Sequence, residues 1–255
     1  MNIVVLVKSA IDEAELRADP SGHPILKGAA TKMSNFDMNG VEEAVRQKEK
    51  LGGTVIVVTL GGSDSKKAIK EALAMGGTRA VHILAEPDAA PDSLGTAYCL
   101  AEAIKKIEGV DLVVCSEGAS DTYQGQAGAM VAEFLDMPFL AFARKVDIDG
   151  GKIKCEQGFD KGVRVIEAKL PAVVSVVSEA NQPRYPTLLQ VMVAGRKAIE
   201  EVPLAALKGA GYPDTGTKVL DVTLQAANRK RVLFDGSPEE AGRKLIEALK
   251  QEGVL

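Results

Sequence analysis

The sequence predicts an α/β protein with a doubly wound, mainly parallel β-sheet, an added antiparallel hairpin region and a C-terminal arm. Short runs of β-branched and Leu residues alternate with segments whose apolar residues recur at helical spacing. Glycine pairs such as Gly52-Gly53 end the helical segments. The length of 255 residues and the hydrophobic content of 46% are sufficient to bury a sizeable core.

The first part of the chain alternates predicted strands and helices. Residues 3–7 form a continuous Ile, Val and Leu run, which is typical of a strand buried on both faces. Further strands are predicted over residues 54–60, 80–84 and 111–115, and helices over residues 38–51, 64–75, 91–107 and 124–135. This β-α order predicts strands that run parallel in one sheet.

The pattern changes after Pro138. Polar and apolar residues alternate over residues 144–149, 152–156 and 163–168, which predicts antiparallel strands with one solvated face. Residues 172–177 return to the continuous apolar pattern of a buried strand. We therefore expect a hairpin region to extend an otherwise parallel sheet.

The C-terminal region differs again in composition. Residues 208–217 are rich in Gly, Pro and Lys, which predicts an extended arm. Residues 237–252 predict an amphipathic helix with Ser237 as its N-cap. The sequence therefore predicts an α/β domain over residues 1–201, followed over residues 202–255 by an arm and a helix that pack on their own domain or on a partner.

Composition argues against several classes of partner. The formal net charge is −4, the pI is about 5.4 and Trp is absent, which argues against nucleic acid. The three cysteines, Cys99, Cys115 and Cys155, form no C-x-x-C pair, so no metal or redox motif is predicted and a reducing compartment is favoured. The N-terminal apolar run is too short for a signal peptide, and no run of about 18 to 20 apolar residues predicts insertion into a membrane. We expect a cytoplasmic protein.

A nucleotide loop is the first candidate for function. In a doubly wound sheet, ligands bind beyond the carboxyl ends of the strands, where residues 7–11, 60–63 and 116–128 are expected to meet. Residues 116–128 carry small side chains and open a helix, so their backbone N–H groups could approach a phosphate, with Thr122 and Gln126 as further donors. The pattern alone is equally compatible with a glycine-rich loop that binds nothing.

Residues for ordinary acid–base or nucleophilic catalysis are not predicted. The two histidines are His23 and His82, and His82 lies inside a predicted strand, where a core role is favoured. No G-x-S-x-G elbow, H-E-x-x-H motif or acidic metal box is present. Lys8 ends the first strand, where it could meet a phosphate or remain solvated. These observations indicate that a bound cofactor supplies the chemistry.

A second candidate lies at residues 179–192, where two prolines, Arg184 and Tyr185 precede the pair Leu188-Leu189. Apolar residues on such a stiff loop can anchor a partner. The alternative is a loop that folds over its own core.

Motifs in both candidates resemble the electron transfer flavoprotein beta subunit family, and the resemblance extends from residue 1 to about residue 199. The motifs occur in the family's order. They are residues 3–8 with Asp12, Asn35-Phe36, residues 41–44, residues 72–76, residues 121–128 and residues 181–188.

The resemblance implies a heterodimer in which an alpha subunit supplies most of the site for a shared FAD, with Phe36 near the flavin ring. It also implies an adenine nucleotide in this subunit, either AMP or, in electron-bifurcating members, a second FAD that oxidises NADH. Loop pattern and resemblance together assign the remaining cofactor-binding residues. These are Val7, Lys8, Leu60, Gly61, Gly118, Asp121, Thr122, Gly125, Gln126, Ala127 and Gly128.

The resemblance further implies partners: acyl-CoA or other flavin dehydrogenases, as in fatty acid oxidation, and a quinone oxidoreductase. Arg184, Tyr185 and Leu188 match the partner-binding segment, with Leu188 as the anchor. A carrier, not a stand-alone enzyme, is therefore the leading interpretation. Residues 120–124 differ from the Gly-Asp-Thr-Ala-Gln loop of bifurcating members, yet Asp121-Thr122 keeps that alternative open. A third interpretation, from the fold alone, is an ATP-binding module of the universal-stress type.

Overall fold

The computed structural model describes residues 1–26, 28–86, 90–213, 216–217, 219–224 and 230–255. These residues divide into two compact units. The larger consists of Met1–Arg17 and Ile25–Leu220, and the smaller of Ala18–Pro24 and Asp221–Leu255. Each unit is described by itself.

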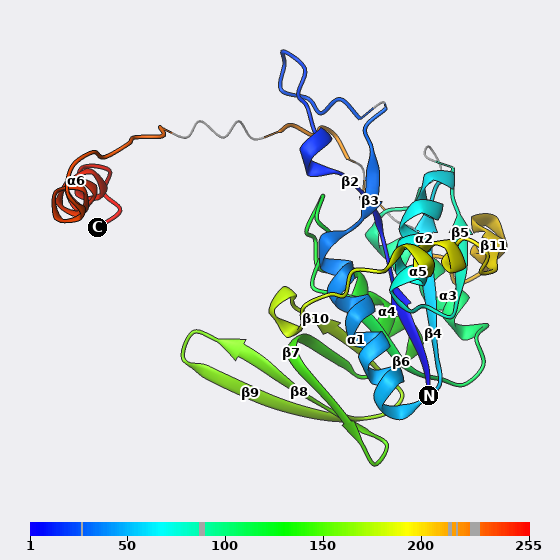
Figure 1. The fold of residues 1–255 in the computed structure, drawn as a ribbon. Helices are drawn as coiled ribbons and strands as arrows, with labels where there is room; N and C mark the ends of the chain where they lie inside the picture. Colours follow the sequence, from blue (N-terminus) through cyan, green and yellow to red (C-terminus); the bar gives the residue numbers. More distant parts are fainter. Residues whose placement is uncertain (27, 87–89, 214–215, 218, 225–229) are drawn as a thin grey trace. The chain divides into compact units, whose positions relative to one another are not determined.

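A single large sheet forms the centre of the larger unit (Figure 1). In the described residues it has nine strands in the order β11-β5-β4-β1-β6-β10-β7-β8-β9. They are β1 (Asn2–Leu6), β4 (Thr54–Gly61), β5 (Arg79–Leu84), β6 (Val110–Ser116), β7 (Phe139–Asp149), β8 (Lys152–Phe159), β9 (Gly162–Lys169), β10 (Ala172–Val176) and β11 (Ile199–Pro203). Neighbouring strands run parallel from β11 to β7, and β8 and β9 add an antiparallel hairpin. The predicted fold class is confirmed.

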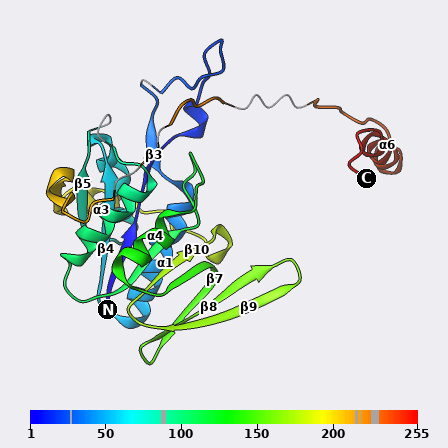
Figure 2. The same cartoon turned by 180° about the vertical axis from the view of Figure 1, so that it is seen from behind.

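Helices cover both faces of the sheet (Figures 1 and 2). On one face lie α1 (Asn35–Leu51), α2 (Lys66–Met75) and α5 (Leu188–Ala194), and on the other lie α3 (Ser93–Lys105) and α4 (Ala127–Leu135). Shorter elements connect them: the antiparallel ribbon of β2 (Ser9–Ile11) and β3 (Thr31–Met33), and the 3₁₀ helices η1 (Glu13–Glu15), η2 (Ser63–Ser65), η4 (Ser178–Ala180) and η5 (Leu204–Leu207).

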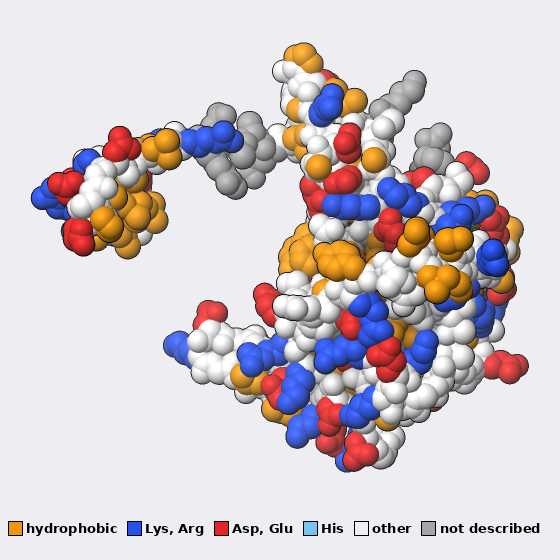
Figure 3. All heavy atoms as spheres, in the orientation of Figure 1, with side chains coloured by type: hydrophobic (Ala, Val, Ile, Leu, Met, Phe, Trp, Pro, Cys, Tyr) orange, Lys and Arg blue, Asp and Glu red, His pale blue; other side chains and the backbone are white. Residues whose placement is uncertain are grey.

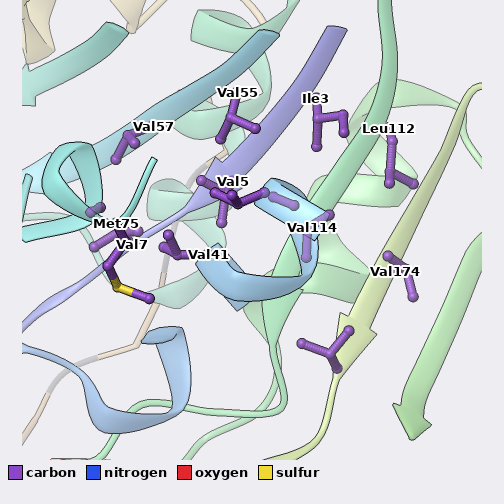
Figure 4. Packing of buried hydrophobic residues seen from close by; sticks show 14 of the residues in the cluster. Ile3, Val5, Val7, Val41, Val55, Val57, Met75, Leu112, Val114 and Val174 are labelled. Carbon is purple, nitrogen blue, oxygen red and sulfur yellow. The ribbon is translucent and has the colours of Figure 1, made fainter. Parts of the chain in front are cut away.

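The core consists of two apolar clusters, one on each face of the sheet. Successive side chains of a strand point to opposite faces, so Ile3 and Val5 of β1 enter the cluster beneath α1 and α2, which Figure 4 shows. Val4 and Leu6 enter the cluster beneath α3 and α4. Each such Val, Leu or Ile contributes about 1.5–3 kcal/mol of burial free energy. The continuous apolar run at residues 3–7 thus reflects a central strand covered on both faces.

The order of the strands reverses beside β1. The chain adds β4 and β5 on one side of β1 and then returns to place β6 on the other side. Leu6 pairs with Val58 of β4, and Val5 pairs with Val114 of β6. The carboxyl ends of β1 and β6 therefore flank the switch point at which doubly wound sheets bind ligands.

Several boundaries differ from the sequence prediction. Helix α1 begins at Asn35, three residues before the predicted start, because Asn35-Phe36-Asp37 lack the apolar spacing of the rest of the helix. Strand β7 begins at Phe139, before the predicted start at residue 144, because its first half pairs parallel to β10 and only the second half alternates. The ribbon β2–β3 and edge strand β11 were not predicted, because β2 and β3 have only three residues each and Glu200-Glu201 interrupt the apolar pattern of β11.

The smaller unit contains the predicted C-terminal helix, α6 (Pro238–Gln251). Ser237 and Glu240 form a reciprocal capping box at its start, which confirms Ser237 as the N-cap. Within this unit Ala18 bridges Pro24, and the N–H of Leu224 donates to the carbonyl of Gly22 over 2.8 Å. Across the described ranges of both units, every helix is too short or too polar to cross a bilayer.

Candidate functional site

The switch point gathers three segments of the larger unit: the turn after β1, the first turn of α1 and the loop after β6. Lys8 extends from the first and places its Nζ 2.6 Å from Asp121 Oδ1 and 3.4 Å from Thr122 Oγ1 in the loop. The structure thus brings together three residues predicted from separate motifs. They form a solvent-facing group with one cation, one carboxylate and one hydroxyl.

Glycines shape the loop where it turns into α4. Gly125 has a φ of +63°, in the left-handed region that favours glycine, and a Cβ there would lie 3.0 Å from the Glu117 carbonyl oxygen. A Cβ on Gly128 would lie 2.5 Å from Cys115 Sγ. The helix therefore approaches β6 more closely than any residue with a side chain allows.

Among the described residues, none accepts a hydrogen bond from the first backbone N–H groups of α4. Gln126 is the N-cap, and its side chain makes no capping hydrogen bond. The first N–H groups of the helix, from Ala127 onward, can therefore donate to a ligand. These groups and the positive end of the helix dipole favour an anion. The predicted positions of Gln126, Ala127 and Gly128 all lie at this helix end.

An aromatic pair joins the loop to α1. The rings of Tyr123 and Phe36 lie 5.2 Å apart between centroids, and the Tyr123 hydroxyl donates to Glu117 Oε2 over 2.9 Å. Tyr123 has a φ of +45° and packs against Gly118, where a Cβ would lie 2.9 Å from its ring. Phe36, which the family resemblance places near a flavin, is therefore in contact with the loop after β6. Sequence reasoning missed Tyr123, although an aromatic residue within a glycine-rich loop is a usable signal.

A buried carboxylate lies beneath this group. Asp37, in the first turn of α1, is 5% exposed and accepts the Lys8 N–H over 2.7 Å and the Ser116 hydroxyl. Burial raises the pKa of Asp37 from 3.8 to about 7, although the bonds from Ser116 and Lys8 lower it in part. No sequence motif indicated a role for Asp37, because an acidic residue at the start of a helix is common and is explained by its favourable interaction with the helix dipole.

Other predicted cofactor residues lie near the same edge of the sheet but outside this group. Val7 is buried and its N–H donates to the Val58 carbonyl over 3.1 Å. Leu60 and Gly61 end β4, the strand next to β1, and in the described residues no hydrogen bond joins them to the loop. Gly61 instead lies with its carbonyl oxygen 3.1 Å from Nε2 of the fully buried His82, which confirms a core position for that histidine.

The predicted partner segment is fastened to α1 through Arg184. Its Nε lies 2.8 Å from Glu42 Oε2, and its Nη1 lies 2.6 Å from Glu49 Oε1. The guanidinium holds the pKa of Glu49 below its usual range. Arg184 thus anchors the segment internally and does not point away from the protein.

The residues after Arg184 face solvent. Tyr185 is 87% exposed and Leu188 is 78% exposed. Thr187 and Gln190 form a capping box that starts α5, and buried Ala194 ties the helix to the core. Figure 3 shows the hydrophobic side chains that gather over α5, which we call the α5 apolar patch. It consists of Tyr185, Leu188, Leu189, Val191, Met192 and Val193.

A hollow in the surface lies apart from the switch point. A cavity of about 720 Å³ opens between α1, the β7–β8 hairpin and η4. Charged side chains dominate its lining, and none of the residues predicted as a site belongs to it. We place the candidate site at the switch point because of its chemistry. Half of the ten residues that line the cavity already form ion pairs, namely Glu43, Arg46, Lys50, Lys145 and Glu156.

The fold and this loop define a class: a doubly wound α/β domain with an anion-favouring loop at its switch point. A family model described as "Electron transfer flavoprotein domain" matches residues 25–207. Curated proteins named electron transfer flavoprotein subunit beta match the whole chain. That of Thermoanaerobacterium thermosaccharolyticum is 34% identical over 263 residues, with 100% of both chains covered. That of Bacillus subtilis is 32% identical over 257 residues, also with 100% of both covered. That of Megasphaera elsdenii is 33% identical, covering 100% of this chain and 90% of the relative.

The chain belongs to the electron transfer flavoprotein family and resembles its beta subunits along its full length. The resemblance drawn from the sequence motifs is confirmed.

Proposed function

We propose that the chain is the beta subunit of a heterodimeric electron carrier, which takes electrons from flavin dehydrogenases and passes them to a quinone oxidoreductase through FAD. The full-length match to beta subunits carries this proposal. The beta subunit name implies an alpha subunit as partner, and the family implies a flavin. We place the complex in the cytoplasm and extend its dehydrogenases to those of acyl-CoA, as in fatty acid oxidation.

The switch point fits an adenine nucleotide, which we propose to be AMP. Lys8 and the free N–H groups at the start of α4 would hold its phosphate, and Thr122 would donate a further hydrogen bond. Asp121 lies 2.6 Å from Lys8 Nζ and would share that cation with the phosphate. Gly125 lets the backbone turn sharply beside the ligand.

FAD, when bound, supplies the one-electron and hydride chemistry, and this chain contributes a wall of its site. Phe36 is the wall residue, and Tyr123 supports it from the nucleotide loop. We further propose that the α5 apolar patch docks the dehydrogenases, with Leu188 as its anchor, while Arg184 holds the segment in place. The arm and α6 pack on the alpha subunit or on their own domain.

Electron bifurcation, with a second FAD that oxidises NADH, is the second candidate. Asp121 and Thr122 support it, because they match the Asp-Thr pair in the Gly-Asp-Thr-Ala-Gln loop of bifurcating members, and both meet Lys8 at the switch point. Tyr123 weighs against it, because its ring already packs over Gly118 and fills space along the loop.

The decisive experiment counts cofactors. The chain is co-purified with its alpha subunit and denatured, and FAD and AMP are quantified per heterodimer by chromatography. We expect one FAD and one AMP. Two FAD without AMP would replace the carrier proposal by bifurcation. A stable lone chain that holds ATP and no flavin would identify a universal-stress type module and overturn both.

Paired variants locate the nucleotide. Gly125→Val should lower the AMP content to near zero, because a side chain there meets the Glu117 carbonyl oxygen. Gly150→Val is the matched control: Gly150 also has positive φ, but it lies in the β7–β8 turn with open space around it. Equal AMP content in both variants would contradict the assignment of the loop.

A further inference from the structure

Asp37 joins all three segments of the switch point. Its Oδ2 accepts the N–H of Lys8 after β1, and its Oδ1 lies within hydrogen-bonding distance of Ser116 Oγ at the end of β6. Ser116 Oγ also lies 2.9 Å from the carbonyl oxygen of Gly118, inside the nucleotide loop. Asp37 therefore reaches the loop through one intervening hydroxyl.

When Asp37 is ionised, the hydrogen bonds among Asp37, Ser116 and Gly118 lack one proton. Ser116 has a single hydroxyl hydrogen, yet its oxygen faces two acceptors, the Asp37 carboxylate and the Gly118 carbonyl. If Asp37 is ionised, the hydroxyl serves the carboxylate and the Gly118 carbonyl faces a lone pair. If Asp37 is protonated, it donates to Ser116, and Ser116 donates to Gly118. Only the protonated form lets the Asp37 carboxyl group and the Gly118 carbonyl both hydrogen-bond to Ser116 at once.

The surroundings of Asp37 also allow a proton near neutral pH. The groups that face it are the Lys8 ammonium, the Asp121 carboxylate and the Cys115 thiol. Lys8 favours the carboxylate, Asp121 disfavours it, and burial disfavours it most, which sets the pKa at about 7. The thiol of Cys115 is neutral throughout this range, because burial raises its pKa to about 12.

We propose that Asp37 is a positioning residue of the nucleotide site and takes up a proton when an adenine nucleotide phosphate binds. The inference rests on the proposed function. A phosphate beside Lys8 adds negative charge near Asp37 and occupies the cation that favours its ionised form. Protonated Asp37 donates to Ser116, which then donates to the Gly118 carbonyl and holds the loop in place. Nucleotide affinity and the protonation of Asp37 are therefore linked, and each promotes the other.

The test is calorimetric titration of AMP into nucleotide-depleted heterodimer from pH 7 to 9, in two buffers of different ionisation enthalpy. The AMP phosphate is about 90% doubly ionised at pH 7 and almost fully so from pH 8 upward, since the second pKa of a phosphate ester is about 6. We expect proton uptake of a fraction of one per AMP, and an affinity that falls by up to about tenfold per pH unit. AMP binding without proton uptake would overturn the inference and leave the proposed function standing.

Asp37→Asn provides the matched variant. The amide keeps an acceptor for the Lys8 N–H and supplies a permanent donor to Ser116, so it imitates the protonated acid. We expect its AMP affinity to be independent of pH and its proton uptake to be zero. Uptake equal to that of the unmodified protein would assign the proton to another group and overturn the inference.

A stability measurement without ligand separates the inference about Asp37 from the proposed nucleotide function. Because folding raises the pKa of Asp37 from 3.8 to about 7, its neutral form stabilises the fold at low pH, and that stability is lost as pH rises through this window. The unfolding midpoint of the unmodified protein should fall relative to that of Asp37→Asn between pH 4 and 7 and then level off. Absence of AMP binding with this trend present would refute the nucleotide function and its linkage, yet retain the titration of Asp37. A flat difference would refute the titration itself.

Discussion

Replacement of Gly128 by Ala tests the close approach of α4 to β6. The new Cβ would lie 2.5 Å from Cys115 Sγ and 3.1 Å from the Phe139 ring, against about 3.5–4.0 Å for an optimal contact between carbon atoms. Relief requires a shift of about 1 Å, and such overpacking costs about 1–3 kcal/mol. Alanine recovers up to about 1 kcal/mol through its higher helix propensity. We therefore expect a net loss of about 1–2 kcal/mol in the free energy of unfolding.

Urea unfolding followed by circular dichroism measures this loss, and a thermal scan should show a fall of about 2–4 °C per kcal/mol. Gly242→Ala is the control, because Gly242 is also helical but has no heavy atom within 4 Å of its added Cβ. Cys115→Ala combined with Gly128→Ala removes the obstructing sulfur and should recover about 1 kcal/mol or more relative to the sum of the single changes. Additive losses, or no loss for Gly128→Ala, would refute the steric argument.

Two further predictions concern the segment before and within α5. Arg184→Ala should cost about 2–4 kcal/mol of unfolding free energy, because it leaves the buried Glu42 carboxylate, whose side chain is 7% exposed, without its positively charged partner. Glu49→Ala, at the 54% exposed partner, should cost less than about 1 kcal/mol, and equal losses in chemical denaturation would contradict the buried pair. Leu188→Ala should leave stability within about 0.5 kcal/mol and weaken dehydrogenase coupling by about 30-fold, as for an anchor worth about 2 kcal/mol. Leu26→Ala, at another exposed leucine, should leave coupling unchanged in the same partner-reduction assay, and similar losses for both would exclude a specific anchor.

The central sheet was predictable because its strands are covered on both faces. Ile3 and Val4 point to opposite clusters, so the apolar run in the sequence directly reports the two helical layers. The other predicted strands could also be recognised from local signals, namely glycine pairs between elements and the alternation of polar and apolar residues. Edge strand β11 escaped prediction, because an edge needs no continuous apolar pattern and Glu200-Glu201 interrupt it.

The sequence named the loop, Lys8 and Phe36 as parts of the candidate site, but not Asp37. Residues 121–128 carry a local pattern, but the role of Asp37 depends on Ser116 and Lys8, which lie 79 and 29 residues away in the chain. Such a junction has no periodicity or spacing that a single sequence can reveal. Arg184 shows the converse: its motif was visible, but its inward ion pairs with α1 follow only from the tertiary structure.

The brevity of α5 has a kinetic consequence. A helix of seven residues is not stable in isolation, yet this one is held by its capping box and by buried Ala194. The backbone that carries Leu188 and its exposed neighbours is therefore ordered before any partner arrives. In the proposed docking role, association then forfeits little backbone freedom, which costs an unstructured segment about 1–2 kcal/mol per residue. Encounters at this surface can be brief and frequent, because no folding step separates collision from contact.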